Sequence, residues 1–154
     1  MLIGNKTLPS FFGEHGPIPV DPKGRIILPR KIRGALPQEE SATCIIAAWL
    51  DGCLAVFDPV AWKEFIARIQ NAASVSEANS RNLIRYFASK SEEVKIDSQG
   101  RISISRKLLA TTEATDNVVV IGAGDHAEIW NPQRYEQHMA SIDLGKVAEL
   151  TDLF

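Results

Sequence analysis

The sequence predicts a β-rich α+β fold in which one structural unit occurs twice in tandem. Residues 20–33 and 96–109 align at an offset of 76 and share the pattern Asp-x-x-Gly-Arg-Ile, followed by an Arg-Lys pair in the same apolar frame. Residues 53–62 and 126–135 align at an offset of 73, and in each an apolar strand runs into Asp-Pro or Asn-Pro. A repeat of this length that keeps its polar identities indicates a duplicated unit.

Local signals predict the same order of elements in each copy: two strands, a short helix, two strands and a longer helix. In the first copy, the strands lie near 17–20, 25–28, 44–49 and 53–57, and the helices near 29–36 and 59–72. Asp51-Gly52 favours a tight hairpin between the last two strands. Asp58 before Pro59 is typical of a helix start, because Asp accepts first-turn amides and Pro suits the first helical position. The longer helix carries one apolar stripe: Trp62, Phe65, Ile66 and Ile69.

In the second copy, the strands lie near 92–96, 101–104, 117–122 and 127–130, and the helices near 105–112 and 132–140. Asn131-Pro132 marks the start of the last helix. Between the copies, Ser74 and Glu77 have the spacing of a capping box and predict a helix to about residue 89. We therefore expect a first repeat over 11–73, a connecting helix over 74–90, a second repeat over 91–140, and a C-terminal tail over 141–154 that docks on a neighbour or frays.

Length and composition are those of an ordinary globular protein. The 154 residues suffice to bury a core, and no apolar run approaches the length that crosses a bilayer. Residues 1–16 lack the features of a secretory signal. Cys44 and Cys53 lie in strand-like apolar runs, so we expect a reduced, buried pair and neither a disulfide nor a zinc site. A cytoplasmic protein without membrane contact is the simplest interpretation.

Positive charge is concentrated in the repeated segments. Residues 20–36 carry five basic and one acidic side chain, and residues 96–110 carry three and one, so these segments have net charges of +4 and +2. Because the whole chain has a net charge of −2, the remainder carries −8. A local positive field matters more to a phosphate backbone than the total charge, so this distribution favours a nucleic-acid partner.

The repeated Asp-x-x-Gly predicts a tight turn at Asp21–Gly24 and at Asp97–Gly100, with Asp and Gly as structural residues. Arg25 and Arg101 follow these turns at the start of a strand. Each arginine has two possible roles: a surface ion pair with the nearby Asp, or a fork that grips phosphate or a guanine edge.

Further cations accompany the two turns. Lys23 stands at the tip of the first turn, where the second turn has Gln99. Two Arg-Lys pairs open the short helices, where cations oppose the helix dipole and so do not serve helix stability. Together with Lys23, Arg25 and Arg101, these cations form the candidate DNA-binding set: Arg30, Lys31, Arg33, Arg106 and Lys107.

Catalysis is a poor interpretation of the motif. Two symmetry-related Asp residues resemble a carboxylate dyad, but Asp21 precedes Pro-Lys and Asp97 precedes Ser-Gln, and each lies beside an Arg that keeps it ionised. The three histidines at 15, 126 and 138 lack metal-ligand spacing. We expect no catalytic residue, no metal, no cofactor and no small-molecule substrate.

Several motifs together resemble the MraZ family, within the SpoVT–AbrB swapped-hairpin superfamily. The resemblance extends over about residues 11–140. Its motifs are Phe12-Gly13-Glu14, the turn at 21–26 with Leu28-Pro29 and Arg33, the second turn at 97–102, and Glu128-Ile129-Trp130.

The resemblance implies two AbrB-like swapped-hairpin units fused as a pseudo-two-fold barrel with short helices. It also implies a nucleoid-associated repressor of the division and cell wall gene cluster, acting as a ring-shaped homo-oligomer on short direct repeats in double-stranded DNA upstream of its own operon. The family's DNA-contacting role falls on Arg25 and Arg101. Ser105 and Leu109 depart from Pro29 and Arg33 of the first copy, so we expect the first copy to carry more of the DNA affinity. The alternative is an AbrB-type adaptor that assembles with proteins and does not bind DNA.

Overall fold

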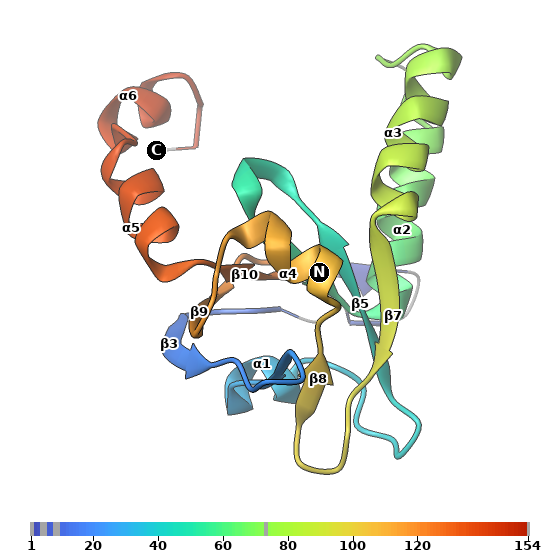
Figure 1. Cartoon of the computed structure of the whole chain (residues 1–154). Helices are drawn as coiled ribbons and strands as arrows, with labels where there is room; N and C mark the ends of the chain where they lie inside the picture. Colours follow the sequence, from blue (N-terminus) through green and yellow to red (C-terminus); the bar gives the residue numbers. More distant parts are fainter. Residues whose placement is uncertain (1, 4–5, 8–9, 73, 154) are drawn as a thin grey trace.

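The computed structural model describes residues 2–3, 6–7, 10–72 and 74–153, and in this part of the chain the fold is mixed α+β with antiparallel strand pairing. The elements in chain order are β1 Leu2–Ile3, β2 Lys6–Thr7, β3 Glu14–Pro19, β4 Arg25–Ile27, α1 Arg30–Gly34, β5 Thr43–Ala48, η1 Leu50–Gly52, β6 Leu54–Phe57, α2 Pro59–Gln70, α3 Glu77–Ser89, β7 Ser91–Lys95, β8 Arg101–Ser103, α4 Arg106–Thr112, β9 Asn117–Gly122, β10 Ala127–Trp130, α5 Pro132–Ala140 and α6 Leu144–Glu149. Figure 1 shows two helical arms, α2 with α3 and α5 with α6, on one side of the sheet, and β4 with β8 at the opposite end.

The main sheet interleaves the two repeats. Its strand order is β3-β9-β10-β6-β5-β7, so the hairpins β5–β6 and β9–β10 meet in the middle through β6 and β10. The outer strands are exchanged, because β3 of the first repeat pairs with β9 of the second, while β7 of the second pairs with β5 of the first. The outer strand of each repeat therefore finds its hydrogen-bonding partner in the other repeat.

Alternation along the strands divides the apolar residues between the two faces of this sheet. Cys44, Ile46, Val118 and Val120 are fully buried in the main core, which lies between the sheet and the β4–β8 ribbon with α1 and α4. On the other face, separate clusters form under α2 and beside α5, around Phe57 and Trp130. The expectation that both cysteines are reduced and buried is confirmed.

Local sequence signals for turns and helix starts are largely confirmed. The Asp58 carboxylate accepts the Val60 amide at 2.8 Å, and the Asn131 side chain accepts the Gln133 amide at 3.0 Å, each ahead of a proline at the first helical position. In the hairpin at Asp51-Gly52, both residues have positive φ, and the loop contains the three residues Leu50–Gly52, because the Trp49 amide donates to the Cys53 carbonyl. The stripe predicted on α2 packs against the Phe57 cluster through Trp62 and Phe65.

Two expectations about where elements start were wrong. The cap of α3 is Ser76, whose hydroxyl accepts the Asn79 amide at 3.2 Å, and not Ser74. Strand β3 begins at Glu14, three residues before the predicted start, because its first residues pair with β9. The tail contains a helix, α6, with Asp143 as its cap. Among the described residues, no helix has both the length and the apolar character needed to span a membrane.

Candidate nucleic-acid interface

The two repeated turns adopt the same geometry at one end of the molecule. In the first turn, the Asp21 carboxylate accepts the amides of Lys23 and Arg25 at 2.9 and 2.8 Å, while its carbonyl accepts the Gly24 amide at 2.9 Å. In the second, Asp97 accepts the amides of Gln99 and Arg101 at 2.9 and 2.8 Å. Each Asp therefore organises its own turn.

Each arginine that follows a turn is held by the same carboxylate. Arg25 Nε lies 2.7 Å from Asp21 Oδ2, and Arg101 Nε lies 2.8 Å from Asp97 Oδ2. Among the described residues, the Nη atoms of the two arginines have no hydrogen-bonding partner, and both side chains are about 30% exposed. The ion pair and the fork are therefore compatible: Nε fixes the guanidinium, and the two Nη groups stay available to a ligand.

The same contacts keep the two carboxylates ionised. The backbone amide of Arg25 is the largest cause of a lowered Asp21 pKa, and the Arg25 guanidinium adds to it. The Arg101 amide lowers the Asp97 pKa in the same way. A carboxylate with a lowered pKa does not act as a proton donor near neutral pH, which agrees with a structural role.

The two turns are fastened to each other across the β4–β8 ribbon. The Leu28 amide donates to the Gly100 carbonyl, and the Ile104 amide donates to the Gly24 carbonyl, both at 2.9 Å. At Gly24, φ is +78°, and an added Cβ would lie 2.6 Å from the Ile104 carbonyl oxygen. Glycine is needed here both for its backbone conformation and for this close approach.

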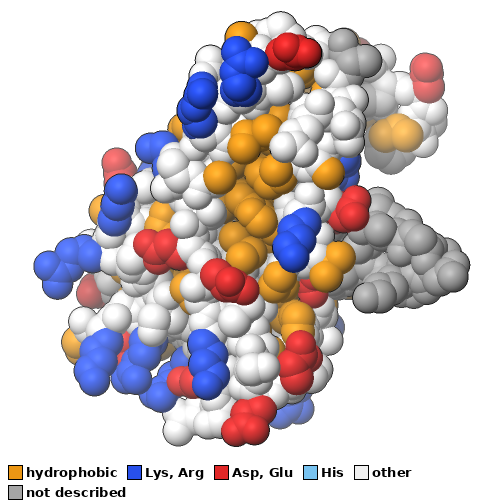
Figure 2. Space-filling view, turned by 90° about the vertical axis from the view of Figure 1, so that its right-hand side faces the viewer, with side chains coloured by type: hydrophobic (Ala, Val, Ile, Leu, Met, Phe, Trp, Pro, Cys, Tyr) orange, Lys and Arg blue, Asp and Glu red, His pale blue; other side chains and the backbone are white. Residues whose placement is uncertain are grey.

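Beside each turn lie basic side chains that belong to the other repeat. A groove of about 820 Å³ runs beside the first turn and is lined by Lys23 and by Arg106 of the second repeat. Near the second turn, Gln99 shares a groove with Arg30 and Arg33 of the first repeat. Figure 2 shows Lys and Arg side chains, with acidic neighbours, gathered at the end where the turns lie in Figure 1.

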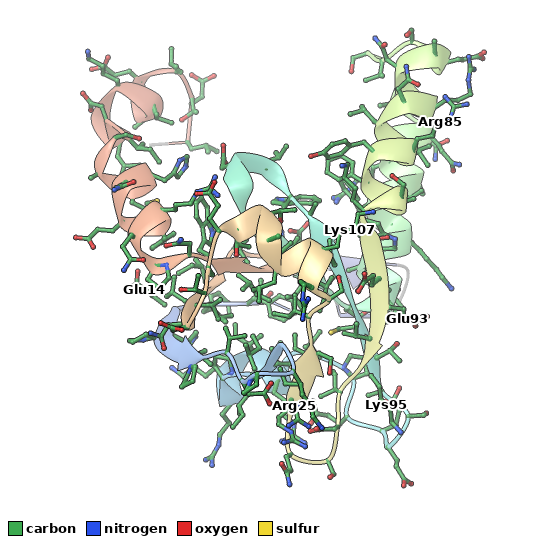
Figure 3. The ribbon with its side chains drawn as sticks, in the orientation of Figure 1. Glu14, Arg25, Arg85, Glu93, Lys95 and Lys107 are labelled. Carbon is green, nitrogen blue, oxygen red and sulfur yellow. The ribbon has the colours of Figure 1, made fainter. Side chains whose placement is uncertain are left out.

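Four of the predicted site residues line neither groove: Arg25, Lys31, Arg101 and Lys107. Figure 3 shows Lys107 well separated from Arg25, and Lys107 lines a small cavity between α4 and the end of α3 with Lys90 and Glu92. Lys31 is exposed on α1 and lines neither groove. The geometry therefore places Lys23 with Arg106 in one groove and Arg30 with Arg33 in the other. Arg25 and Arg101 lie outside both grooves, at the starts of the paired strands β4 and β8.

A polar cluster that the sequence analysis missed lies on the sheet face opposite the main core. The His126 ring contacts Asp125 at 2.8 Å and Glu128 at 3.0 Å, and it stacks on Phe57. Burial alone would lower the His126 pKa, but these two carboxylates raise it. Glu128 also accepts Trp130 Nε1 at 2.9 Å. Among the described residues, no group of three or more His, Cys, Asp or Glu could hold a metal ion.

Exchanged strands and a pair of matched cationic turns define this molecule as a tandem-repeat α+β protein. A family model described as "MraZ protein, putative antitoxin-like" matches the chain twice, over residues 11–86 and 87–153. The chain belongs to the MraZ family, as its repeated motifs predicted.

Several relatives named transcriptional regulator MraZ match most of the chain. The protein of Deinococcus radiodurans is 32% identical over 131 residues, which cover 85% of this chain and 88% of that protein. Those of Lachnoclostridium phytofermentans and Limosilactobacillus fermentum are each 34% identical, over 83% and 90% of this chain and 86% and 94% of theirs. These relatives carry the name of a regulator and not of an enzyme.

Proposed function

We propose that this protein is a DNA-binding transcriptional regulator that represses the division and cell wall gene cluster from short direct repeats upstream of its own operon. The observation that carries the proposal is the pair of equivalent guanidinium groups, Arg25 and Arg101, each fixed through Nε with its Nη groups unengaged by described residues. The name of the relatives supports the same function. Repression then follows when a bound site overlaps the promoter.

The cations of the two grooves suit a DNA backbone, whereas the carboxylates that also line the first groove do not: Asp21, Glu92 and Asp116. Lys23 and Arg106 near one turn, and Arg30 near the other, would contact phosphates and set the register. Arg25 and Arg101, with their planar forks presented at fixed angles, would read guanine edges or grip phosphates bidentately. The first turn carries Lys23 where the second has Gln99, so the first repeat should contribute more affinity.

One molecule offers few contacts, so self-assembly into a ring is part of the proposal. A ring would present several pairs of turns at a high effective concentration to spaced DNA repeats. Apolar side chains available for assembly include those of α6 and the segment after it: Leu144, Val147, Leu150 and Leu153, all exposed. Figure 2 also shows a band of hydrophobic side chains on the α3–β7 side of the molecule.

We infer that the exchanged strands are the swapped-hairpin arrangement of AbrB-like proteins, closed about a pseudo-two-fold axis as a barrel. The repeats would then occupy 11–73 and 91–140, with 74–90 as a connecting helix and 141–154 as a tail. The pairing of β3 with β9 and of β7 with β5 supports this assignment. A role on chromosomal DNA would place the protein in the cytoplasm with the nucleoid.

Fluorescence anisotropy with DNA from upstream of the gene tests the proposal. Arg25→Ala and Arg101→Ala should each weaken binding by about 1–3 kcal/mol, with Arg25→Ala the more damaging, because each removes one bidentate contact. Arg85→Ala is the matched control, since Arg85 lies on α3 far from Arg25 in Figure 3 and its Nη1 donates to Asn82. Circular dichroism checks that every variant is folded.

Salt dependence provides a second measurement. Each phosphate contact contributes about −0.9 to the slope of log K against log salt, so a multivalent complex should have a steep slope. Wild-type affinity in the Arg25→Ala/Arg101→Ala double variant would contradict the proposal. An assembly that neither binds this DNA nor is retained on heparin at low salt would favour the adaptor alternative.

A further inference from the structure

The two repeats differ at one position that touches the candidate site. At the offset of 76 that relates the turns, Arg33 of the first repeat corresponds to Leu109 of the second. Arg33 lies in the last turn of α1 and Leu109 in the middle of α4, and both side chains are half-buried. Since the surrounding backbone is duplicated, this difference changes what each helix can offer to the turn of the other repeat.

Arg33 lies directly against the second turn. Its Nη2 donates to the Ser98 carbonyl at 3.4 Å, a long bond made 65 residues away in the sequence. A side-chain carbon on Gly100 would lie 2.7 Å from Arg33 Nη1 and 3.1 Å from its Cδ, so the arginine covers the open side of this glycine. Gly100 is accordingly buried, whereas its counterpart Gly24 is only half-buried.

At the first turn, the atom that lies against the glycine belongs to the backbone: an added Cβ on Gly24 would meet the Ile104 carbonyl oxygen and no arginine. Leu109 lines the groove of about 820 Å³ beside this turn, and a leucine side chain cannot donate to a carbonyl. The corresponding groove beside Ser98, which Arg33 lines, is about 420 Å³. The first turn instead contains Pro22, whose ring restricts the backbone without outside help, where the second has Ser98.

We propose that Arg33 is a positioning residue for the second turn, and that it holds Arg101 in the orientation needed for DNA. The first turn obtains its rigidity from Pro22, and the second obtains it from a side chain of the other repeat. The link to DNA rests on the function proposed above, whereas the bracing of the turn is a property of the free protein.

Hydrogen exchange in the free protein tests the bracing. The amides of Gln99, Gly100 and Arg101 all donate to Asp97, and they report on the second turn. Arg33→Leu should fold, because leucine occupies the equivalent position in α4, and it should speed exchange of these three amides about two- to tenfold. Exchange at the equivalent amides of residues 23–25 should not change. Lys31→Leu, which removes an exposed cation from the same helix, is the matched control and should leave both turns unchanged.

A double-mutant cycle on DNA binding separates positioning from direct contact. Arg33→Leu should weaken binding several-fold in the wild-type and Arg25→Ala backgrounds, and it should have almost no effect in the Arg101→Ala background. An equal loss in all three backgrounds would mean that Arg33 contacts DNA independently, and it would overturn the positioning role. Unchanged exchange at the second turn would overturn the bracing. If neither Arg25 nor Arg101 affects DNA binding, the proposed function fails, while the exchange result still decides whether Arg33 braces the turn.

Discussion

Gly24→Ala should destabilise the protein more than an alanine at another glycine with the same backbone conformation. Gly24 has φ +78°, and Gly124, in the hairpin between β9 and β10, has φ +87°. At Gly124, no heavy atom of the described residues, its two chain neighbours aside, lies within 4 Å of an added Cβ, whereas at Gly24 the Ile104 carbonyl oxygen lies at 2.6 Å. The pair therefore separates the cost of the left-handed conformation from the cost of the contact.

The two costs can be estimated separately. A non-glycine residue in the left-handed region costs about 1–2 kcal/mol, which is the whole expected effect of Gly124→Ala. At Gly24, the Ile104 carbonyl must also move, which strains or breaks the 2.9 Å hydrogen bond from the Ile104 amide to the Gly24 carbonyl. Losing a part-buried backbone bond adds about 1–3 kcal/mol, so Gly24→Ala should cost about 2–5 kcal/mol in all.

Urea denaturation followed by circular dichroism measures both variants against the wild type, with an unchanged slope as the sign that only stability has changed. Gly24→Ala should also reduce DNA affinity, because the turn that orients Arg25 is displaced. Equal destabilisation of the two variants would refute the argument that the two turns are tightly fastened across the ribbon. A neutral Gly24→Ala would refute the assigned backbone conformation as well.

Stability should depend on pH through His126 and Glu128. Because folding raises the His126 pKa, the stability that His126 contributes is fully present below pH 6.5 and is lost as the pH rises through the pKa of the folded state. Folding lowers the Glu128 pKa, so the stability that Glu128 contributes is fully present above about pH 4.5 and is lost as the pH falls. Unfolding free energies between pH 4 and 9 should peak between these limits, and His126→Gln should flatten the alkaline side. Ser76→Ala should cost about 1 kcal/mol of unfolding free energy and Ser74→Ala almost nothing, because only Ser76 caps α3. Burial raises the Cys44 pKa to about 12, so this thiol should react with a disulfide reagent at pH 8 only after unfolding, as a timed absorbance assay would show.

Features set by neighbouring residues were the most predictable from the sequence. Asp58-Pro59 and Asn131-Pro132 placed two helix starts, because caps act over three residues and need no tertiary contact. The duplicated Asp-x-x-Gly-Arg placed both turns and both arginines for the same reason. The capping-box spacing from Ser74 to Glu77 predicted the wrong cap, because Ser76, directly before the first helical residue, accepts the Asn79 amide.

Features that depend on distant partners were not predictable. Nothing local distinguishes pairing of β3 within its own repeat from pairing with β9, and the contact of Arg33 with the second turn likewise spans 65 residues. Helix α6 is too short to give a clear periodic pattern. The polar cluster did leave a signal, since Glu128 and Trp130 alternate along β10 and share one face of it, and His126 directly before the strand continues the alternation.

Joining both halves in one polypeptide removes a constraint that applies to an assembly of identical subunits. In a homodimer, every substitution in one hairpin loop occurs in its mate, and each half-site is read by the same residues. Here each half has its own sequence, so the two turns differ, with Pro22-Lys23 in one and Ser98-Gln99 in the other. The strands that pair between the repeats still hold the two halves together. With the function proposed above, the two unlike turns would recognise an asymmetric stretch of a duplex with a polarity that a symmetric pair lacks.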